Sequence, residues 1–408
     1  MKKSAPPDVS FAALRHPGFR VYFVVSALAM MADSIEHVIS YWMMFQKFHS
    51  QTLGGFAVVS HWVPFLFFSV YAGALADRFD PRRIIQLGML CFIVASLGWG
   101  YFFVTDTLEM WHAMALLVIH GFAGVLWGPA SQLLIQDIVE PAQLPSAVRL
   151  SATARWLGLL MGPAIGSVIM LAFGPSIGIL VNVLFYLPLL IWLWKAPYVR
   201  KASRAAVRGF SDIWSTMRAI AGNRTIVSMT LLAGGASLFV GNAYQAQMPE
   251  FAEDLGHGNA GVAYSMLLAA DAAGALIAGF VLESRGLLQP RPRTAFILAM
   301  LWCLAIGGFA AAPSYPIAFA LLFVAGFLQL AFAAMGQTLV QLNAPAEIRG
   351  RVIGLYSMSS LGLRAFSGVT VGILGSMIGI HWSLALSAMV LLAITAGLLA
   401  FTLKARPA

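Results

Sequence analysis

Long apolar stretches limit what this chain can fold into. A helix needs about 20 apolar residues to cross a bilayer, and twelve stretches reach that length: residues 20–46, 53–77, 84–105, 110–136, 147–173, 176–195, 225–249, 259–282, 294–312, 315–341, 352–379 and 381–403. Only 10% of the 408 residues are charged, against about 25% in soluble domains. We therefore predict an all-α polytopic membrane protein with twelve transmembrane helices.

Lysine and arginine are sorted to one side of the predicted bundle. Of 25 such residues, Lys47 alone falls in a loop on one side, and Arg155 and Arg364 fall inside spans. The others lie on the opposite side with both termini. By the positive-inside rule, both termini are then cytoplasmic. The net charge of +9 thus indicates membrane orientation and anionic lipid, and not nucleic acid.

Residues 196–224 divide the spans into two groups of six. This segment is basic, and residues 209–221 have the spacing of an amphipathic helix lying on the inner surface, where anionic lipids attract it. A shift of 206 residues places Gly73 and Asp77 on Gly279 and Glu283. We therefore predict two six-helix pseudo-repeats, an N-terminal half (1–195) and a C-terminal half (225–408), joined by a basic linker (196–224).

The turn after the second span is densely charged, with Gly73, Asp77, Arg78, Arg82 and Arg83 in quick succession. Such a turn cannot lie in hydrocarbon and belongs at a membrane face, where it could simply fix orientation. It resembles the loop between helices two and three of the major facilitator superfamily, G-x-x-x-D-R-x-G-R-[RK], and departs from it at Asp80, where the family usually has glycine. The resemblance implies a cytoplasmic gate.

The fifth span contains a second motif, formed by Gly158, Gly162, Pro163 and Gly166. Glycines four residues apart form a stripe that lets another helix approach closely, and the proline bends the helix. As a pattern alone this is a packing motif. It resembles the antiporter motif G-x-x-x-G-P-x-x-G-G of facilitator exporters, with Ser167 in place of the last glycine. Most of the chain resembles one branch, which includes the enterobactin exporter and some macrolide efflux proteins.

Charged groups inside the spans indicate a transport pathway, because they are costly in the bilayer. Asp33, Glu36 and His37 share one face of the first span. A carboxyl group at that depth can exchange a proton near neutral pH. We predict proton coupling through these three residues and through Asp271 in the eighth span, the alternative being a structural hydrogen-bonded cluster.

Other polar and aromatic residues in the spans predict a substrate cavity. The candidates are Tyr41, His61, Trp62, Trp127, Arg155, Gln329 and Arg364. Some have alternative interpretations. Arg155 could extend to the surface, His61 could be a structural donor, and Asp271 could pair with Arg364.

The sequence predicts a secondary active transporter, a proton-coupled exporter of a small amphipathic molecule such as a siderophore or drug, working by alternating access. One alternative is a divalent-metal exporter with Asp33, Glu36 and His37 as ligands. Another is a lipid or lysolipid flippase. We expect no enzyme activity and no cofactor, since no phosphate-binding loop is present and Cys91 and Cys303 lie in separate spans. We expect a monomer in a bacterial inner membrane.

Overall fold

The computed structural model describes residues 11–48, 51–198, 211–241, 243–246, 248–256, 260–285, 289–367, 371 and 374–403, and these contain helices and no strands. The first group of helices comprises η1 (Ala12–Arg15), α1 (Pro17–Phe48), α2 (Gln51–Arg78), α3 (Pro81–Val104), α4 (Met110–Ile138), η2 (Pro141–Gln143) and α5 (Leu144–Lys195). The second comprises α7 (Arg224–Phe239), α8 (Ala243–Ala246), α9 (Met248–Asp254), α10 (Ala260–Ser284), α11 (Pro292–Ala310), α12 (Tyr315–Asn343), η3 (Ala346–Ile348), α13 (Arg349–Ser360), η4 (Gly362–Phe366), α14 (Leu374–Ile378) and α15 (Ile380–Leu403). Between them lies α6 (Ser211–Ile220).

Nine helices within the described residues are long and apolar enough to cross a membrane, and α7 is a shorter apolar helix. The fifth and sixth predicted spans together form α5, which turns at Gly174, where φ is 73°. That left-handed backbone suits glycine, and Pro175 then starts the next helical segment.

Two predicted spans are broken instead of continuous. The seventh is interrupted after α7 at Gly241, where φ is 50°, and the helical residues of α8 and α9 follow. The eleventh divides into α13, η4 and α14. At Gly362, in η4, a Cβ atom would lie 2.5 Å from Cα of Leu66. The helix therefore changes form where it meets α2 of the other group.

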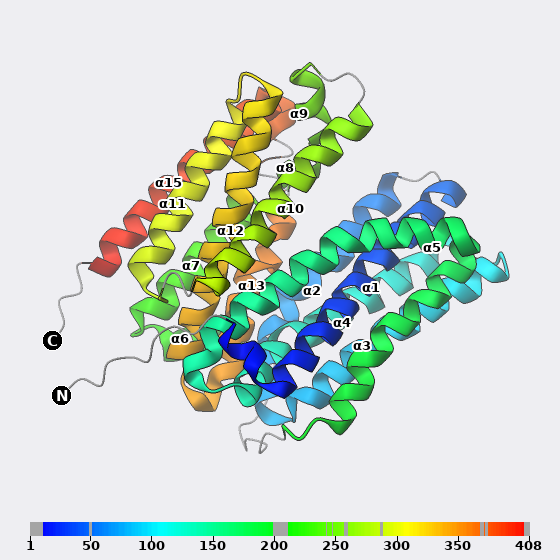
Figure 1. The fold of residues 1–408 in the computed structure, drawn as a ribbon, viewed down its shortest axis with the longest axis horizontal. Helices are drawn as coiled ribbons and strands as arrows, with labels where there is room; N and C mark the ends of the chain where they lie inside the picture. Colours follow the sequence, from blue (N-terminus) through cyan, green and yellow to red (C-terminus); the bar gives the residue numbers. More distant parts are fainter. Residues whose placement is uncertain are drawn as a thin grey trace.

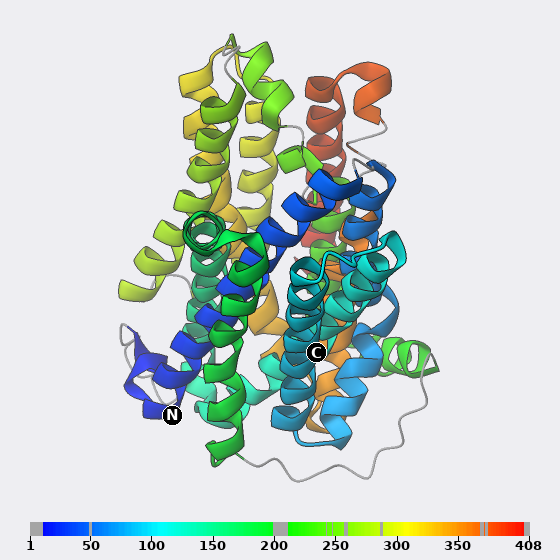
Figure 2. The same ribbon diagram turned by 90° about the vertical axis from the view of Figure 1, so that its right-hand side faces the viewer.

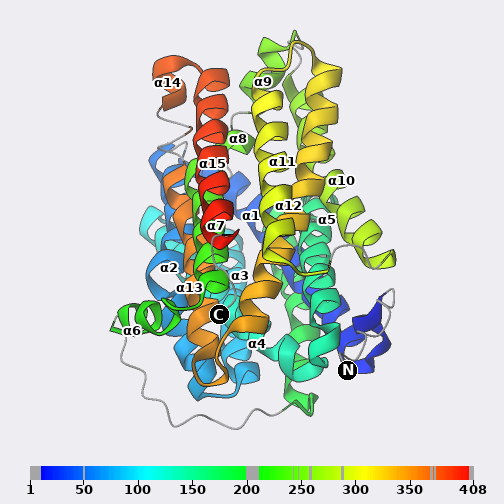
Figure 3. The ribbon, with the colours of Figure 1, turned by 90° about the vertical axis from the view of Figure 1, so that its left-hand side faces the viewer.

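The two groups contact each other along α2 with α13 and along α5 with α10. Figure 1 shows them diverging toward the end that carries α9. In Figures 2 and 3 the start of α1 and the helix α6 lie in the lower part of the molecule, and α9 and α14 lie at the upper end. Charged turns such as Asp77–Arg83 therefore fall at the end where the groups meet.

The helix α6 covers most of the predicted amphipathic segment, of which residues 209 and 210 lie outside the described residues. Ile220 and Thr216 are buried, whereas Trp214 and Met217 are exposed. Arg218 lies over the Trp214 ring, with 5.2 Å between the guanidinium carbon and the ring centroid. An exposed aromatic beside a cation is typical of a helix at a lipid headgroup surface.

Candidate functional site: a cavity between two helix groups

A cavity of about 340 Å³ lies between the two groups. Its lining includes side chains of α1, α2, α4 and α5 from the first group, and of α12 and η4 from the second. Six of the seven residues predicted to line a cavity are among them: Tyr41, His61, Trp62, Trp127, Arg155 and Arg364. Gln329 is not in the lining, and Gln337 on the same helix is.

A buried network joins two of the predicted acids through a residue that the sequence analysis did not select. His120 of α4 lies between two carboxylates, with Nδ1 2.8 Å from Oε1 of Glu36 and Nε2 2.9 Å from Oδ1 of Asp33. The hydroxyl of Ser96 donates to Glu36. An imidazolium between two carboxylates leaves one net negative charge, so one further proton neutralises this trio. A histidine ten residues inside the fourth apolar span was the available signal.

Asp33 faces the cavity, whereas Glu36 lies behind it and is 1% exposed. His37 also lines the cavity, and its Nδ1 donates to the backbone carbonyl of Asp33 at 2.8 Å. His37, His61 and His120 come from three helices, and one ring nitrogen of each lies within 4.8 Å of the others. The metal-ligand set predicted from sequence, Asp33, Glu36 and His37, is therefore not the set that lies together.

Asp271 and Arg364 occupy separate environments. Asp271 is buried on α10, where it accepts from the Tyr244 hydroxyl at 3.1 Å and the Gln245 amide at 3.3 Å. Arg364 instead lies over the Trp62 ring, with 5.2 Å from the guanidinium carbon to the centroid. The structure does not pair them, and Asp271 is absent from the cavity lining.

The charged turn after α2 contacts the second group. Asp77 accepts hydrogen bonds from the backbone N–H groups of Gly350, at 2.6 Å, and Arg351, at 3.0 Å. These N–H groups begin α13 and have no partner within the helix, so a carboxylate satisfies them and the helix dipole favours its charge. Gly73 faces the Gly350 carbonyl so closely that any Cβ would collide with it. We call this the Asp77–Gly350 contact.

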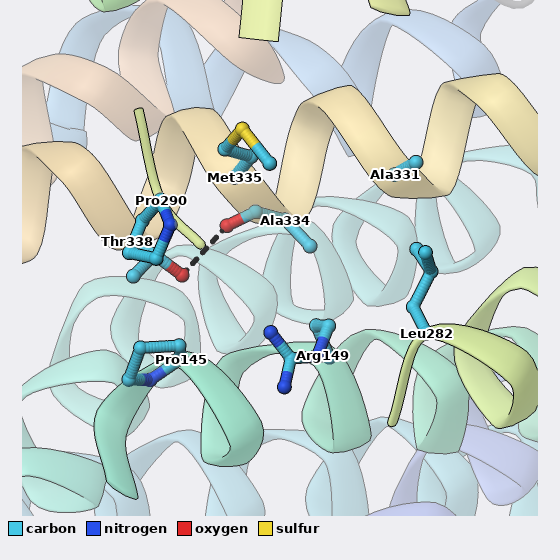
Figure 4. A pocket seen from close by; sticks show the side chains of 8 residues that line it. All are labelled: Pro145, Arg149, Leu282, Pro290, Ala331, Ala334, Met335 and Thr338. Carbon is cyan, nitrogen blue, oxygen red and sulfur yellow. Dashed lines mark hydrogen bonds between the residues drawn. The ribbon is translucent and has the colours of Figure 1, made fainter. Parts of the chain in front are cut away.

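A second contact repeats this arrangement on the other side of the bundle. Glu283, at the end of α10, accepts from the Ser146 hydroxyl and from Nε of Arg149, which is 2.9 Å away. Both donors lie in the first turns of α5. Figure 4 shows Arg149 beside Pro145 and Leu282, below the face of α12 that carries Met335 and Thr338. The shift that relates Asp77 to Glu283 in the sequence thus relates two carboxylates that each bind the start of a helix in the opposite group. We call this second one the Glu283–Arg149 contact.

Comparison with known proteins decides the family. Residues 8–408 match the family described as "Transmembrane secretion effector", abbreviated MFS_3. The chain belongs to the major facilitator superfamily. It is 24% identical to YfiS, an uncharacterised MFS-type transporter of Bacillus subtilis (79% of this chain, 78% of that protein). It is 22% identical to the enterobactin exporter EntS of Shigella boydii (89% and 86%). The Escherichia coli fucose:proton symporter FucP superposes with a TM-score of 0.73 at 11% identity (96% and 100%).

Membership of the superfamily confirms the predicted twelve-helix fold with two six-helix repeats, and its members are transporters, not enzymes. In this transporter the glycine stripe of α5 lies against α1. A Cβ at Gly158 would lie 2.9 Å from Cβ of Met30, and one at Gly162 would collide with the Ser34 side chain. One at Gly166 would lie 3.4 Å from Cα of Ile35. Pro163 lies exposed between the last two glycines. The stripe is a close helix–helix interface, and two of the residues that it meets, Ser34 and Ile35, lie between Asp33 and Glu36 in the chain.

The arginines of the transporter's charged turn contact its own half. Arg82 pairs with Asp80 at 2.6 Å and donates to the Ala196 carbonyl at the end of α5. Arg83 donates to Gln86 at 2.9 Å, and Arg78 lies exposed over Phe79. Asp80, the departure from the family pattern, caps α3 by accepting from the backbone N–H of Arg82 at 3.0 Å. At the position where the family usually has glycine, this chain therefore has the N-cap residue of α3.

We expect Asp77→Asn to slow transport while leaving the protein folded. An asparagine offers one acceptor oxygen without a full charge, and a hydrogen bond to a charged group contributes about 1.5–3 kcal/mol. The equilibrium between closed and open states at this end should shift by about tenfold or more. Initial rates in proteoliposomes at matched protein levels measure the effect, with the exposed Glu253→Gln as control. Equal rates for Asp77→Asn and wild type would remove the gate role.

Proposed function

We propose that this transporter exports a small amphipathic molecule, such as a siderophore or a drug, in exchange for protons. The observation that carries the proposal is the cavity between the two halves, which has Asp33 of the Asp33–His120–Glu36 network in its wall and both inter-half carboxylate contacts at one end. The similarity to EntS, an enterobactin exporter, supports export. With the termini in the cytoplasm, the two contacts close the cytoplasmic side and the cavity receives protons from outside.

Coupling follows from the charge on the network. With Asp33 ionised, the Asp33–His120–Glu36 trio carries one negative charge, and a proton entering from the outer side neutralises it. Neutralisation weakens the attraction between Asp33 and His120. It also removes the free-energy cost of burying a net charge when the cavity closes to water. When the halves rock and the cytoplasmic side opens, water returns and the proton leaves inward. Substrate is released outward when the halves return to the state open to the outside, which completes an exchange of substrate for a proton.

The test is transport by the purified full chain in proteoliposomes. A thermal-stability screen of siderophores, drugs, lysolipids and metal ions first selects a compound that stabilises the folded state. Its movement is then followed with an imposed pH gradient, without one, and with a proton ionophore. We expect accumulation against its own gradient only when the pH gradient is present. Accumulation that persists after the ionophore would reject proton coupling, and a stabilising compound that is never moved would reject export.

A second candidate is export of a divalent metal ion, favoured by the cluster His37, His61 and His120. The nitrogens are close enough to share one ion, and imidazole suits zinc, copper and nickel. Glu36 would orient His120 by accepting from its Nδ1, as second-layer carboxylates do at metal sites. Equilibrium binding of Zn²⁺ or Ni²⁺ to purified protein tests it. Tight binding that is lost in His61→Ala would favour the metal, and no binding would exclude it.

A further inference from the structure

Two arginines reach the central cavity from opposite halves of the transporter. Arg155 belongs to α5 of the first half, and Arg364 belongs to η4 of the second. Within the described part of the chain, the ion pairs of aspartate and glutamate involve other partners, and neither arginine takes part in one. Two cations that face a shared cavity, neither of them paired with a protein carboxylate, repel each other and favour a negative ligand.

Arg364 has an unused donor. Its guanidinium lies over the Trp62 ring, and its buried Nε–H has no hydrogen-bond partner. A buried donor without a partner costs the free energy of its lost hydration, and more so when it is charged. Arg155 lies exposed within the cavity wall. Arg155 therefore points into the cavity and does not extend to the membrane surface, which was the alternative for this residue.

The acid in the cavity wall does not neutralise these arginines. Asp33 is the one carboxylate in the described lining, and its partners are His120, at 2.9 Å, and His37. The wall therefore has two permanent positive charges against one carboxylate that is already paired. The same lining includes aromatic side chains, Tyr22, Phe65, Phe92, Trp62 and Trp127 among them. An anion with a flat apolar body matches this combination.

We infer that the substrate of this cavity is an aromatic or otherwise flat amphipathic anion, whose oxyanion bridges Arg155 and Arg364. This inference rests on the proposed function and names its substrate class. Arginine presents a planar fork of donors that fits a carboxylate or similar oxyanion. Because the two arginines belong to different halves, a bound anion holds the halves together, and a neutral compound of the same shape does not. A negative charge on the substrate thus favours both its binding and the closure of the cavity.

The experiment compares two probes of one shape, 1-naphthoate and its neutral amide 1-naphthamide. Binding to the detergent-purified full chain is followed by quenching of tryptophan fluorescence, since Trp62 and Trp127 line the cavity, and by the rise in unfolding temperature. No pH gradient is applied. We expect the anion to bind about tenfold or more tightly than the amide, the effect of a charge-assisted hydrogen bond. Arg155→Gln and Arg364→Gln should each lose that preference, and the exposed Arg291→Gln should keep it.

Equal affinity for the two probes in the wild type, including no binding of either, would overturn the inference. So would an unchanged preference for naphthoate in both cavity variants. If Arg364→Gln fails to fold, Arg364→Lys and Arg155→Gln decide, because lysine keeps the charge without the fork and should keep only part of the preference. The proposed function fails separately. If Asp33→Asn loses gradient-driven export but still prefers naphthoate, the anion site is intact. If the wild type prefers naphthoate but transports no compound, export is rejected and the anion site is not.

Discussion

Asp33→Asn is expected to reduce export driven by a pH gradient to the level of protein-free liposomes. Asparagine keeps the size of Asp33 and one acceptor oxygen toward His120, now 2.9 Å from the carboxylate, but it cannot take up a proton. Substrate binding and downhill exchange should survive, because the arginines and aromatic walls are unchanged. Efflux is measured in proteoliposomes with and without an imposed pH gradient, beside binding of the same substrate.

The matched control is Asp106→Asn, in the turn between α3 and α4. Asp106 is exposed, and the hydrogen bond from the Lys47 ammonium, 2.6 Å away, holds the pKa of its carboxyl below its ordinary value. It therefore stays ionised near neutral pH and carries no proton, and the Asp106→Asn variant should transport normally. Full gradient-driven transport by Asp33→Asn would show that Asp33 is not the carrier, and Glu36 and Asp271 would be examined next. Loss of divalent-metal binding in Asp33→Asn would instead favour metal export.

Gly162→Leu is expected to damage folding and transport far more than Leu160→Ala. A Cβ at residue 162 would already collide with the Ser34 side chain and would lie 3.1 Å from the Met31 carbonyl oxygen. Leucine adds three further carbons, so α5 must move away from α1. Overpacking at a helix interface costs about 3 kcal/mol or more when backbone must move. The ionisable face of α1 moves with it, so coupling should fail even in molecules that fold.

Thermal unfolding in detergent and transport at matched protein levels separate the two effects. Leu160 is half-buried and lies off the stripe, so its truncation removes contacts without displacing a helix. The Gly162 variant should show a lower unfolding temperature and a lower rate per folded molecule. Normal export by Gly162→Leu would show that the stripe is not an interface.

Much of the fold is readable from the sequence because bilayer thickness fixes the length of each apolar run. The sequence does not encode as plainly where a helix breaks against a neighbour. The predicted seventh and eleventh spans are continuous by hydropathy, yet Gly241 and Gly362 interrupt them where the other helices approach. Glycine is compatible with a continuous helix as well, so only the tertiary contact decides.

Helical spacing predicts only part of the arrangement of residues on one helix, and it predicts no pair between helices. Spacing alone places Asp33, Glu36 and His37 on one face, and in the structure Asp33 and His37 line the cavity whereas Glu36 lies behind it. The partner His120 lies 84 residues from Glu36 in the sequence, so no helical spacing relates the two. Gln329 and Gln337 illustrate the same limit. They lie about 80° apart around a helix axis at 100° per residue, so the packing of α12 alone determines which faces the cavity.

The Asp77–Gly350 and Glu283–Arg149 contacts together affect how tightly the membrane stays sealed. They lie on opposite sides of the bundle and share no residue, so their free energies should add. If each contact makes spontaneous separation of the two halves about tenfold rarer, both contacts together make that separation about a hundredfold rarer. A cell that keeps a proton gradient loses little of it through such a protein at rest. Either contact alone would let ions leak about tenfold more often, which gives a reason for a duplicated chain to retain an acid at both equivalent positions.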